Sequence, residues 1–203
     1  IEFVRGKANG RTFMDESTGT NINKRDDYRG IATAAGYVCI DFTERNARNG
    51  AAEQMLASIP ASLLQDLTFE IKIAAAAPAN GRIKAVALYR PPTNNPFIRK
   101  VLSVTQGFVA AGTDAAPNIM YLGTGNSGGK LKRIWIHEGT PGSVTGVQIR
   151  IANNVVHEST RADTENEQSR NKLVPQAGIH VIDFIEDGNL AGMLDTANAP
   201  NVE

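Results

Sequence analysis

The chain has 203 residues, and its 21 basic and 21 acidic side chains give a formal net charge of zero. A protein that neutralises phosphates needs a surplus of lysine and arginine on one face, so we expect no sequence-specific nucleic-acid partner. The 41% hydrophobic content is enough for packed cores, and the single Cys39 excludes an internal disulfide.

The chain opens with a pattern typical of a β-hairpin. Residues 1–4 are strand-like, and residues 12–14 return after Asn9-Gly10. That pair favours a tight turn because both central residues of a type I′ turn need positive φ. The polar residues 19–35 are predicted to form a surface loop.

A strand and a helix are expected next. Alternating apolar residues predict a strand over Tyr37–Thr43, with Ile40 and Phe42 in a core and Cys39 as a small buried side chain. Residues 44–59 have helical spacing and end before Pro60, so they are predicted to form one short helix in a connection.

The other elements are predicted as strands. Leu67–Ile73 alternates most clearly, and its apolar face is expected to point into a core. Further strands are predicted over residues 83–89, 101–109, 131–137, 144–151 and 179–185, with a turn at 153–154 and a second polar loop over 159–176.

Two segments far apart in the chain are nearly the same. Gly36–Glu44 reads GYVCIDFTE and Gly178–Glu186 reads GIHVIDFIE, with five of nine positions identical at an offset of 142 residues. Weaker matches in the same order, such as Glu16-Ser17-Thr18 with Glu158-Ser159-Thr160, share this offset. The repeat is too long for a solenoid and has the size of a domain.

The predicted fold is all-β, with two tandem jelly-roll domains of the Greek-key sandwich type. The predicted strands are short and do not alternate regularly with helices, which argues against a parallel sheet. The long loops between the strands are typical of jelly rolls. We place the first jelly roll at residues 1–112, a Gly-rich linker at 113–130 and the second jelly roll at 131–203.

The second unit stops where its next strand should begin. Val202-Glu203 falls about where Phe69-Glu70 lies in the first unit. An incomplete sheet would expose an unpaired edge, so we expect the native polypeptide to continue past Glu203, and the same reasoning allows a strand before Ile1.

No catalytic, cofactor or metal site is predicted. The loop Gly123–Lys130 departs from the phosphate-binding pattern at two positions, and it is interpreted as a flexible linker. His137, His157 and His180 lack metal-ligand spacing and are interpreted as strand-surface residues. The cluster Lys130, Lys132 and Arg133 is interpreted as a solvated strand edge.

Two groups of acidic residues lead to further hypotheses. Asp41 and Asp183 occupy equivalent places in different domains, so we expect a repeated structural role, such as accepting bonds from the following turn, rather than a glycosidase pair. Glu186-Asp187-Gly188-Asn189 offers oxygen ligands for a structural calcium ion without the calcium-loop spacing, and a tight turn is its default interpretation.

The segment HVIDFIEDGNLAGMLDT at 180–196, preceded by KRIWIHEG and VQIRIANNVV, resembles the major capsid proteins of tailless, membrane-containing icosahedral DNA phages of the corticovirus type. The resemblance covers most of 131–203 and, more loosely, 1–90. It implies two upright jelly rolls per chain, and trimers that look hexagonal from outside over an internal membrane.

We therefore expect a non-enzymatic major capsid protein located in the virion and assembled in the host cytoplasm. Its implied partners are itself, as a homotrimer with lattice contacts, other capsid or vertex proteins, and internal viral membrane proteins or lipid. The alternative is a tandem β-sandwich module that binds carbohydrate or a receptor, which predicts a solvent-facing aromatic platform. A jelly-roll enzyme of the cupin type would need clustered histidine and glutamate ligands, which the histidine spacing does not support.

Overall fold

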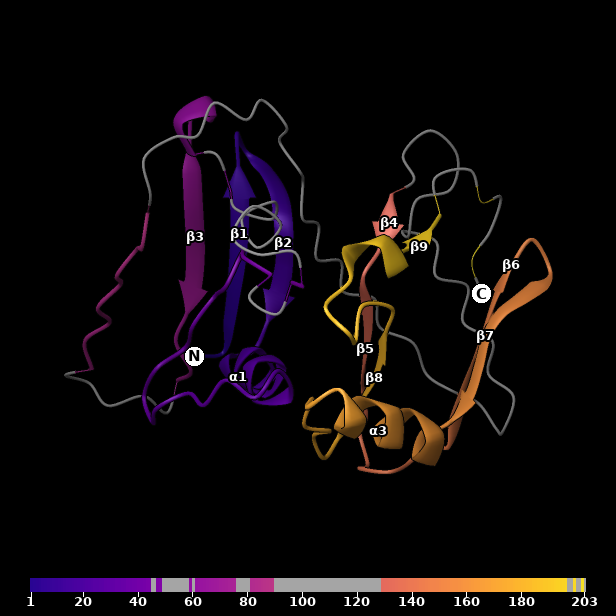
Figure 1. The fold of residues 1–203 in the computed structure, drawn as a ribbon. Coiled ribbons are helices and arrows are strands. Elements are labelled where there is room, and N and C mark those ends of the chain that lie inside the picture. The colour runs from indigo at the N-terminus through magenta and orange to yellow at the C-terminus, as the bar shows by residue number, and fades with distance from the viewer. Residues whose placement is uncertain are drawn as a thin grey trace.

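Two β-rich halves lie side by side in a computed structural model of the chain (Figure 1). The structure describes residues 1–44, 47–48, 59, 61–75, 81–89, 129–196, 199 and 202. Most of the predicted helix over 44–59, the strand over 101–109 and nearly all of the 113–130 linker lie outside these residues, so the domain boundaries stay predictions.

The first half is built on a three-stranded antiparallel sheet in the order β2-β1-β3. The strands are β1 (Phe3–Ala8), β2 (Arg11–Ser17) and β3 (Leu67–Lys72). Asn9 and Gly10 join β1 to β2 with φ of 49° and 70°, which confirms the predicted hairpin. A short 3-10 helix, η2 (Ala61–Leu63), precedes β3.

The core of the first half lies against one face of this sheet. Its buried members are Val4, Phe13, Met14 and Ile22, and Ile40, Phe42 and Leu67 pack against them. The rings of Phe42 and Phe69 lie 5.9 Å apart. The predicted apolar face of β3 is only partly covered, since Phe69, Ile71 and Ile73 remain 38%, 39% and 46% exposed.

The second half contains three two-stranded antiparallel ladders. Their strands are β4 (Lys130–Leu131) with β9 (Leu194–Asp195), β5 (Arg133–His137) with β8 (Ile179–Asp183), and β6 (Gly146–Ile151) with β7 (Asn154–Thr160). A 3-10 helix, η4 (Leu190–Gly192), leads into β9. All of β8 is buried, and Ile149, Ile182, Ala199 and Val202 form a second core.

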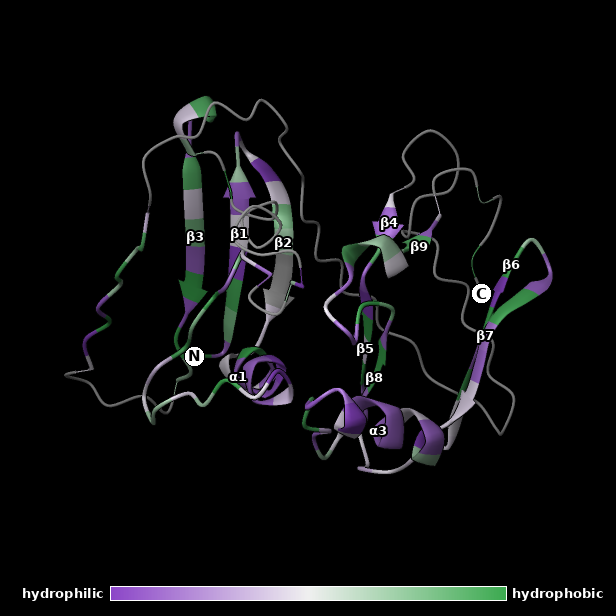
Figure 2. Cartoon of the chain, in the orientation of Figure 1, coloured by the Kyte–Doolittle hydropathy of each residue, from purple (hydrophilic) through white to green (hydrophobic). Residues whose placement is uncertain are grey.

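Both predicted polar loops instead contain a ten-residue α-helix, α1 (Gly19–Tyr28) and α3 (Arg161–Arg170). α3 is hydrophilic almost throughout (Figure 2), so its apolar spacing gave no helical signal. Each helix is started by a threonine N-cap: Thr18 accepts from the Asn21 N–H, and Thr160 accepts from the Asp163 N–H. The threonine N-cap therefore identifies the start of each helix, whereas the pattern of hydrophobic residues does not.

The backbone repeats itself at the offset seen in the sequence. In each half a hairpin with positive φ at its turn leads into a capped helix, and Ala152 and Asn153 take the turn positions of Asn9 and Gly10. Positive φ recurs at Gly30 and Lys172, and at Gly36 and Gly178. The last residue of the hairpin's first strand has a further partner in each half, since Ala8 pairs with Leu67 and Ile151 forms a bridge with Val202, although Val202 lies only 135 residues after Leu67. The hairpins, the capped helices and the turns after them are thus folded alike in the two halves, whereas the segments 37–43 and 179–185 differ.

Two strand predictions are wrong. Residues 37–43 form no strand, although their counterpart β8 does, because β8 pairs with β5 and no described segment pairs with 37–43. Residues 83–89 also join no ladder, and Leu88 and Tyr89 are 93% and 92% exposed. Cys39 is exposed rather than buried, since it lies in the segment that stays out of a sheet.

Candidate functional site

The most elaborate cluster of polar side chains in the described residues lies at the junction between the two halves. Three bonds that involve main-chain atoms cross it: the Val174 N–H donates to the Tyr28 carbonyl (2.8 Å), the Lys24 ammonium to the Ala177 carbonyl (2.8 Å), and the Arg48 N–H to the Gly188 carbonyl (2.9 Å). α1 and the residues after Phe42 therefore carry the first half's side of the junction.

Arg133, at the start of β5, is held between carboxylates of both halves. Its Nε donates to Asp183 Oδ2 (2.6 Å), and its two terminal nitrogens donate to the two Glu44 oxygens (3.1 Å each). The three side chains are almost completely shielded from solvent, with exposed fractions of 9% for Arg133, 5% for Glu44 and 0% for Asp183. The bidentate contact fixes the orientation of the guanidinium as well as its position.

The electrostatics of this network keep Glu44 and Arg133 charged. Burial favours the neutral form of Glu44, but the cations around it, chiefly Arg133 with Lys132 and Arg29, together hold the pKa of Glu44 below its ordinary value. Burial would also lower the pKa of Arg133, yet the Asp183 and Glu44 carboxylates raise it. Because Glu44 and Arg133 are both held in their charged forms, their contacts act as a structural clamp.

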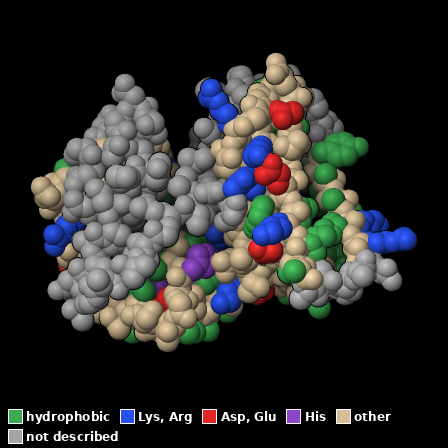
Figure 3. All heavy atoms as spheres, turned by 180° about the vertical axis from the view of Figure 1, so that it is seen from behind, with side chains coloured by type: hydrophobic (Ala, Val, Ile, Leu, Met, Phe, Trp, Pro, Cys, Tyr) green, Lys and Arg blue, Asp and Glu red, His purple; other side chains and the backbone are tan. Residues whose placement is uncertain are grey.

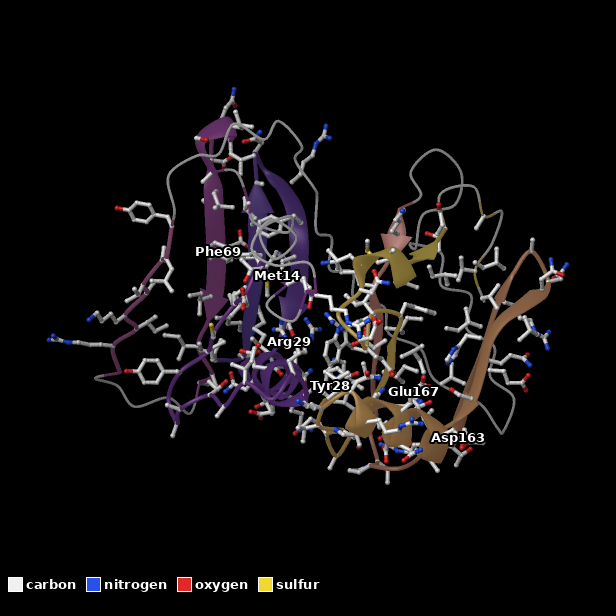
Figure 4. The ribbon with its side chains drawn as sticks, viewed as in Figure 1. Met14, Tyr28, Arg29, Phe69, Asp163 and Glu167 are labelled. Atoms are coloured by element: carbon white, nitrogen blue, oxygen red, sulfur yellow. The ribbon has the colours of Figure 1, made fainter. Side chains whose placement is uncertain are left out.

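Tyr28, the last residue of α1, adds an apolar and a polar contact. It is fully buried in a cluster with Leu173, Ile179 and Val181, all from the second half. Its ring lies 5.3 Å from the Trp135 ring at 81°, and its hydroxyl donates to Asp183 (3.3 Å). Figure 4 shows Tyr28 at the end of α1, facing the second half.

The predicted role of the two equivalent aspartates is confirmed. Asp41 Oδ1 accepts from the Thr43 N–H, and Asp183 Oδ1 accepts from the Ile185 N–H, at 2.9 Å in both cases. Each side chain therefore closes the turn two residues on, as expected from the repeat. The structure gives Asp183 a second role in the clamp.

The lysine and arginine cluster was predicted to be a solvated strand edge, and this holds for the exposed Lys130 but is wrong for Lys132 and Arg133. Arg133 is buried in the clamp, and Lys132 lies 3.5 Å from Glu44, because the neighbouring first half supplies carboxylates that the sequence could not place there. Figure 3 shows positive and negative side chains interleaved on one face. The first sheet also carries the ion pairs Arg5–Glu70 and Lys72–Glu2. The described side chains on the face shown in Figure 3 form no basic stripe of the kind that nucleic acid requires.

The histidines are scattered over three strands, as the sequence indicated. His180 is buried rather than on a strand surface, because it belongs to the fully buried β8. Burial lowers the pKa of each of the three histidines. In the part of the chain that the structure describes, no three histidine, cysteine, aspartate or glutamate side chains are grouped to hold a metal ion.

The segment 186–189 forms the turn that was its default interpretation. Gly188 has φ of 76°, and Asp187 Oδ1 accepts from the Asn189 N–H (2.9 Å). A calcium ion at this turn stays a prediction. No helix among the described residues is both long and apolar enough to cross a membrane.

Comparison with known proteins agrees with a two-domain coat protein. Residues 1–90 match the family described as the viral coat protein P2 N-terminal domain, and residues 98–203 match the viral coat protein P2 C-terminal domain. No curated protein matches. The chain is similar to the crystal structure of the major capsid protein P2 from bacteriophage PM2, with 12% identity and a TM-score of 0.72, over 100% of this chain and 74% of that one.

The fold and its internal clamp thus define a structural protein built from two all-β domains. The chain belongs to the viral coat protein P2 family. This confirms the resemblance seen in the segment 180–196 and the all-β double jelly-roll fold, and it places the protein in the virion coat.

Proposed function

We propose that this chain is the major capsid protein of an icosahedral virus, and that three copies join into a pseudo-hexameric tile. A ring of three two-domain subunits presents six similar sides, which can fill a lattice through repeated contacts. Its partners are other copies of itself, vertex or minor capsid proteins, and the proteins or lipid of an internal viral membrane. Assembly would take place in the host cytoplasm, and the protein would catalyse no reaction.

The repeated backbone and the buried clamp support this proposal most strongly. A tile needs six similar units, and the chain folds one unit twice, with matching hairpins, capped helices and positive-φ positions. A tile also needs a fixed angle between the halves of each copy. The Glu44–Arg133–Asp183 contacts supply that constraint, because all three side chains are nearly dry.

The alternative, a binding module, is less well supported. Such a module would present its aromatic rings to solvent as a platform. Trp135 is instead half-buried against Tyr28 at the junction, and Phe13 lies in the first core. Among the described aromatic side chains, only Tyr37 and Tyr89 are more than half exposed, at 70% and 92%, and they belong to two separate segments rather than one platform.

The oligomeric state of the purified chain tests the proposal. Native mass spectrometry and analytical ultracentrifugation should give a trimer, and electron microscopy of concentrated protein should show hexagonal particles or shells. A chain that stays a monomer at every concentration, and binds a carbohydrate array instead, would overturn the capsid assignment.

A further inference from the structure

The internal repeat provides a template for the contact between copies. This inference rests on the proposed trimer, in which each second half must lie beside the first half of the next copy. Within one chain, the first half already lies beside a second half at the junction. The contact between copies would be its pseudo-symmetric equivalent, so the residues at matching positions identify the surfaces.

One side of the junction is a face of α1. Lys24 donates to the Ala177 carbonyl, Arg25 stacks over the Trp135 ring at 5.6 Å, and Tyr28 is fully buried. The second half thus covers three residues on consecutive turns of α1.

The matching face of α3 is exposed to solvent. An offset of 142 places Asn166, Glu167 and Arg170 at the positions of Lys24, Arg25 and Tyr28, and all three are exposed. We call these three residues the α3 face. Figure 4 shows Glu167 on this helix. The fold therefore covers a helix face in one half and leaves the equivalent face open in the other.

The other side of the junction also has an equivalent in the first half, and most of its residues are exposed to solvent. In the second half, residues 177–181 contact α1 and β5, and Ile179 and Val181 are 2% and 3% exposed. Their counterparts are residues 35–39, which we call the 35–39 strip. There Tyr37 is 70% exposed, and Ala35, Gly36 and Cys39 are exposed as well.

We propose that the α3 face of one copy binds the 35–39 strip of the next copy in the trimer. The matching positions place Arg170 over Tyr37 and Cys39, as Tyr28 lies against Ile179 and Val181. A guanidinium over an exposed tyrosine ring is a favourable pair. This contact is more polar than the junction, as befits an interface between subunits that fold first and then assemble.

Cys39 makes the proposal directly testable, because it is the only cysteine in the chain. The variant Arg170→Cys, treated with a short bis-maleimide, should link Cys39 of one copy to position 170 of the next and give covalent trimers on a denaturing gel. The wild type can link at most pairs of copies. The matched control is Ser62→Cys, an exposed position in η2, at the end of the first sheet opposite α1 (Figure 1).

A second variant tests the same contact without a cross-link. Tyr37→Ala removes an exposed side chain and should raise the trimer dissociation constant about tenfold or more, with the thermal unfolding of the monomer unchanged. Ultracentrifugation over a concentration series measures the first quantity, and circular dichroism measures the second.

The outcomes separate the two proposals. Trimers that form normally, with Arg170→Cys cross-linked no more than Ser62→Cys and Tyr37→Ala without effect, would overturn the α3-face contact and leave the capsid assignment standing. The absence of any trimer in the wild type would overturn both.

Discussion

Arg133 shows how a single side chain can hold two domains together. Its guanidinium satisfies three carboxylate oxygens that come from residues 89 and 50 positions away in the chain. Taking such charges out of water is costly, so an intact buried pair adds little net stability, whereas a broken pair leaves an uncompensated charge. The value of the clamp lies in fixing one arrangement of the halves.

Replacing Arg133 with methionine should therefore be strongly destabilising. We expect Arg133→Met to lower the free energy of unfolding by about 3–5 kcal/mol, because Glu44 and Asp183 stay buried without their cation. Urea denaturation measures the change. Lys72→Met is the control, since the exposed Lys72–Glu2 pair should contribute only about 0–1 kcal/mol. Equal losses in both variants would contradict the clamp.

Glu186 gives a pH dependence of defined sign. Burial and the carboxylates of Glu167 and Asp183 raise its pKa from 4.5 to about 7. Between these values the folded state binds more protons than the unfolded state, so stability falls as pH rises through this window. Glu186→Gln should flatten that part of the stability curve and be more stable than the wild type above neutral pH.

The measurement for Glu186 is a difference between two curves. Urea midpoints of the wild type and Glu186→Gln are measured across this pH range. Their difference removes the contribution of the histidines to the pH dependence, because both proteins contain the same histidines. The exposed Glu158→Gln serves as the charge-matched control and should leave the curve unchanged. A Glu186→Gln difference that is constant over the range would show that the carboxyl titrates normally.

At the scale of elements, the sequence predicted the hairpins and strands better than the helices. Asn9-Gly10 and the alternation in Leu67–Ile73 are local signals, and both led to the observed strands. α1 and α3 bury few side chains, so they lack the apolar stripe that identifies a helix. Their detectable signal was the repeated Glu-Ser-Thr, whose threonine caps the helix.

That capping role leads to a prediction for α3. Thr160→Ala removes the acceptor for the Asp163 N–H (3.2 Å), and we expect a loss of about 1 kcal/mol in the free energy of unfolding. Thr160→Ser keeps the oxygen and should lose much less. Chemical denaturation of both variants makes the comparison, and a serine variant as unstable as the alanine variant would point to lost methyl packing instead.

At the scale of the whole molecule, the sequence predicted the duplication but not the contact between the two copies of the unit. The repeated IDF segments identified the pair Asp41 and Asp183, and their shared turn could be inferred from the repeat. The clamp could not, because Glu44 and Arg133 differ from a surface acid and base only in what the other half places beside them. Such partners depend on the packing of domains rather than on any local pattern.

Tyr28 is the residue whose loss should separate the halves. Tyr28→Ala removes a fully buried ring from the cluster with Leu173, Ile179 and Val181, together with its bond to Asp183. Removing a buried aromatic side chain costs about 3–5 kcal/mol, and here the loss falls on the junction rather than on either core.

We therefore expect Tyr28→Ala to change the form of unfolding as well as its midpoint. Once the junction is weakened, the two halves should unfold in separate transitions, which calorimetry detects as a calorimetric enthalpy above the van't Hoff value. Tyr89→Ala is the matched control, since Tyr89 is 92% exposed and its loss should change stability by less than about 0.5 kcal/mol. Because a pseudo-hexameric tile requires a fixed angle between the halves, Tyr28→Ala should also fail to form shells under conditions in which Tyr89→Ala assembles. Shells of normal shape from Tyr28→Ala would show that the lattice, and not the junction, sets that angle.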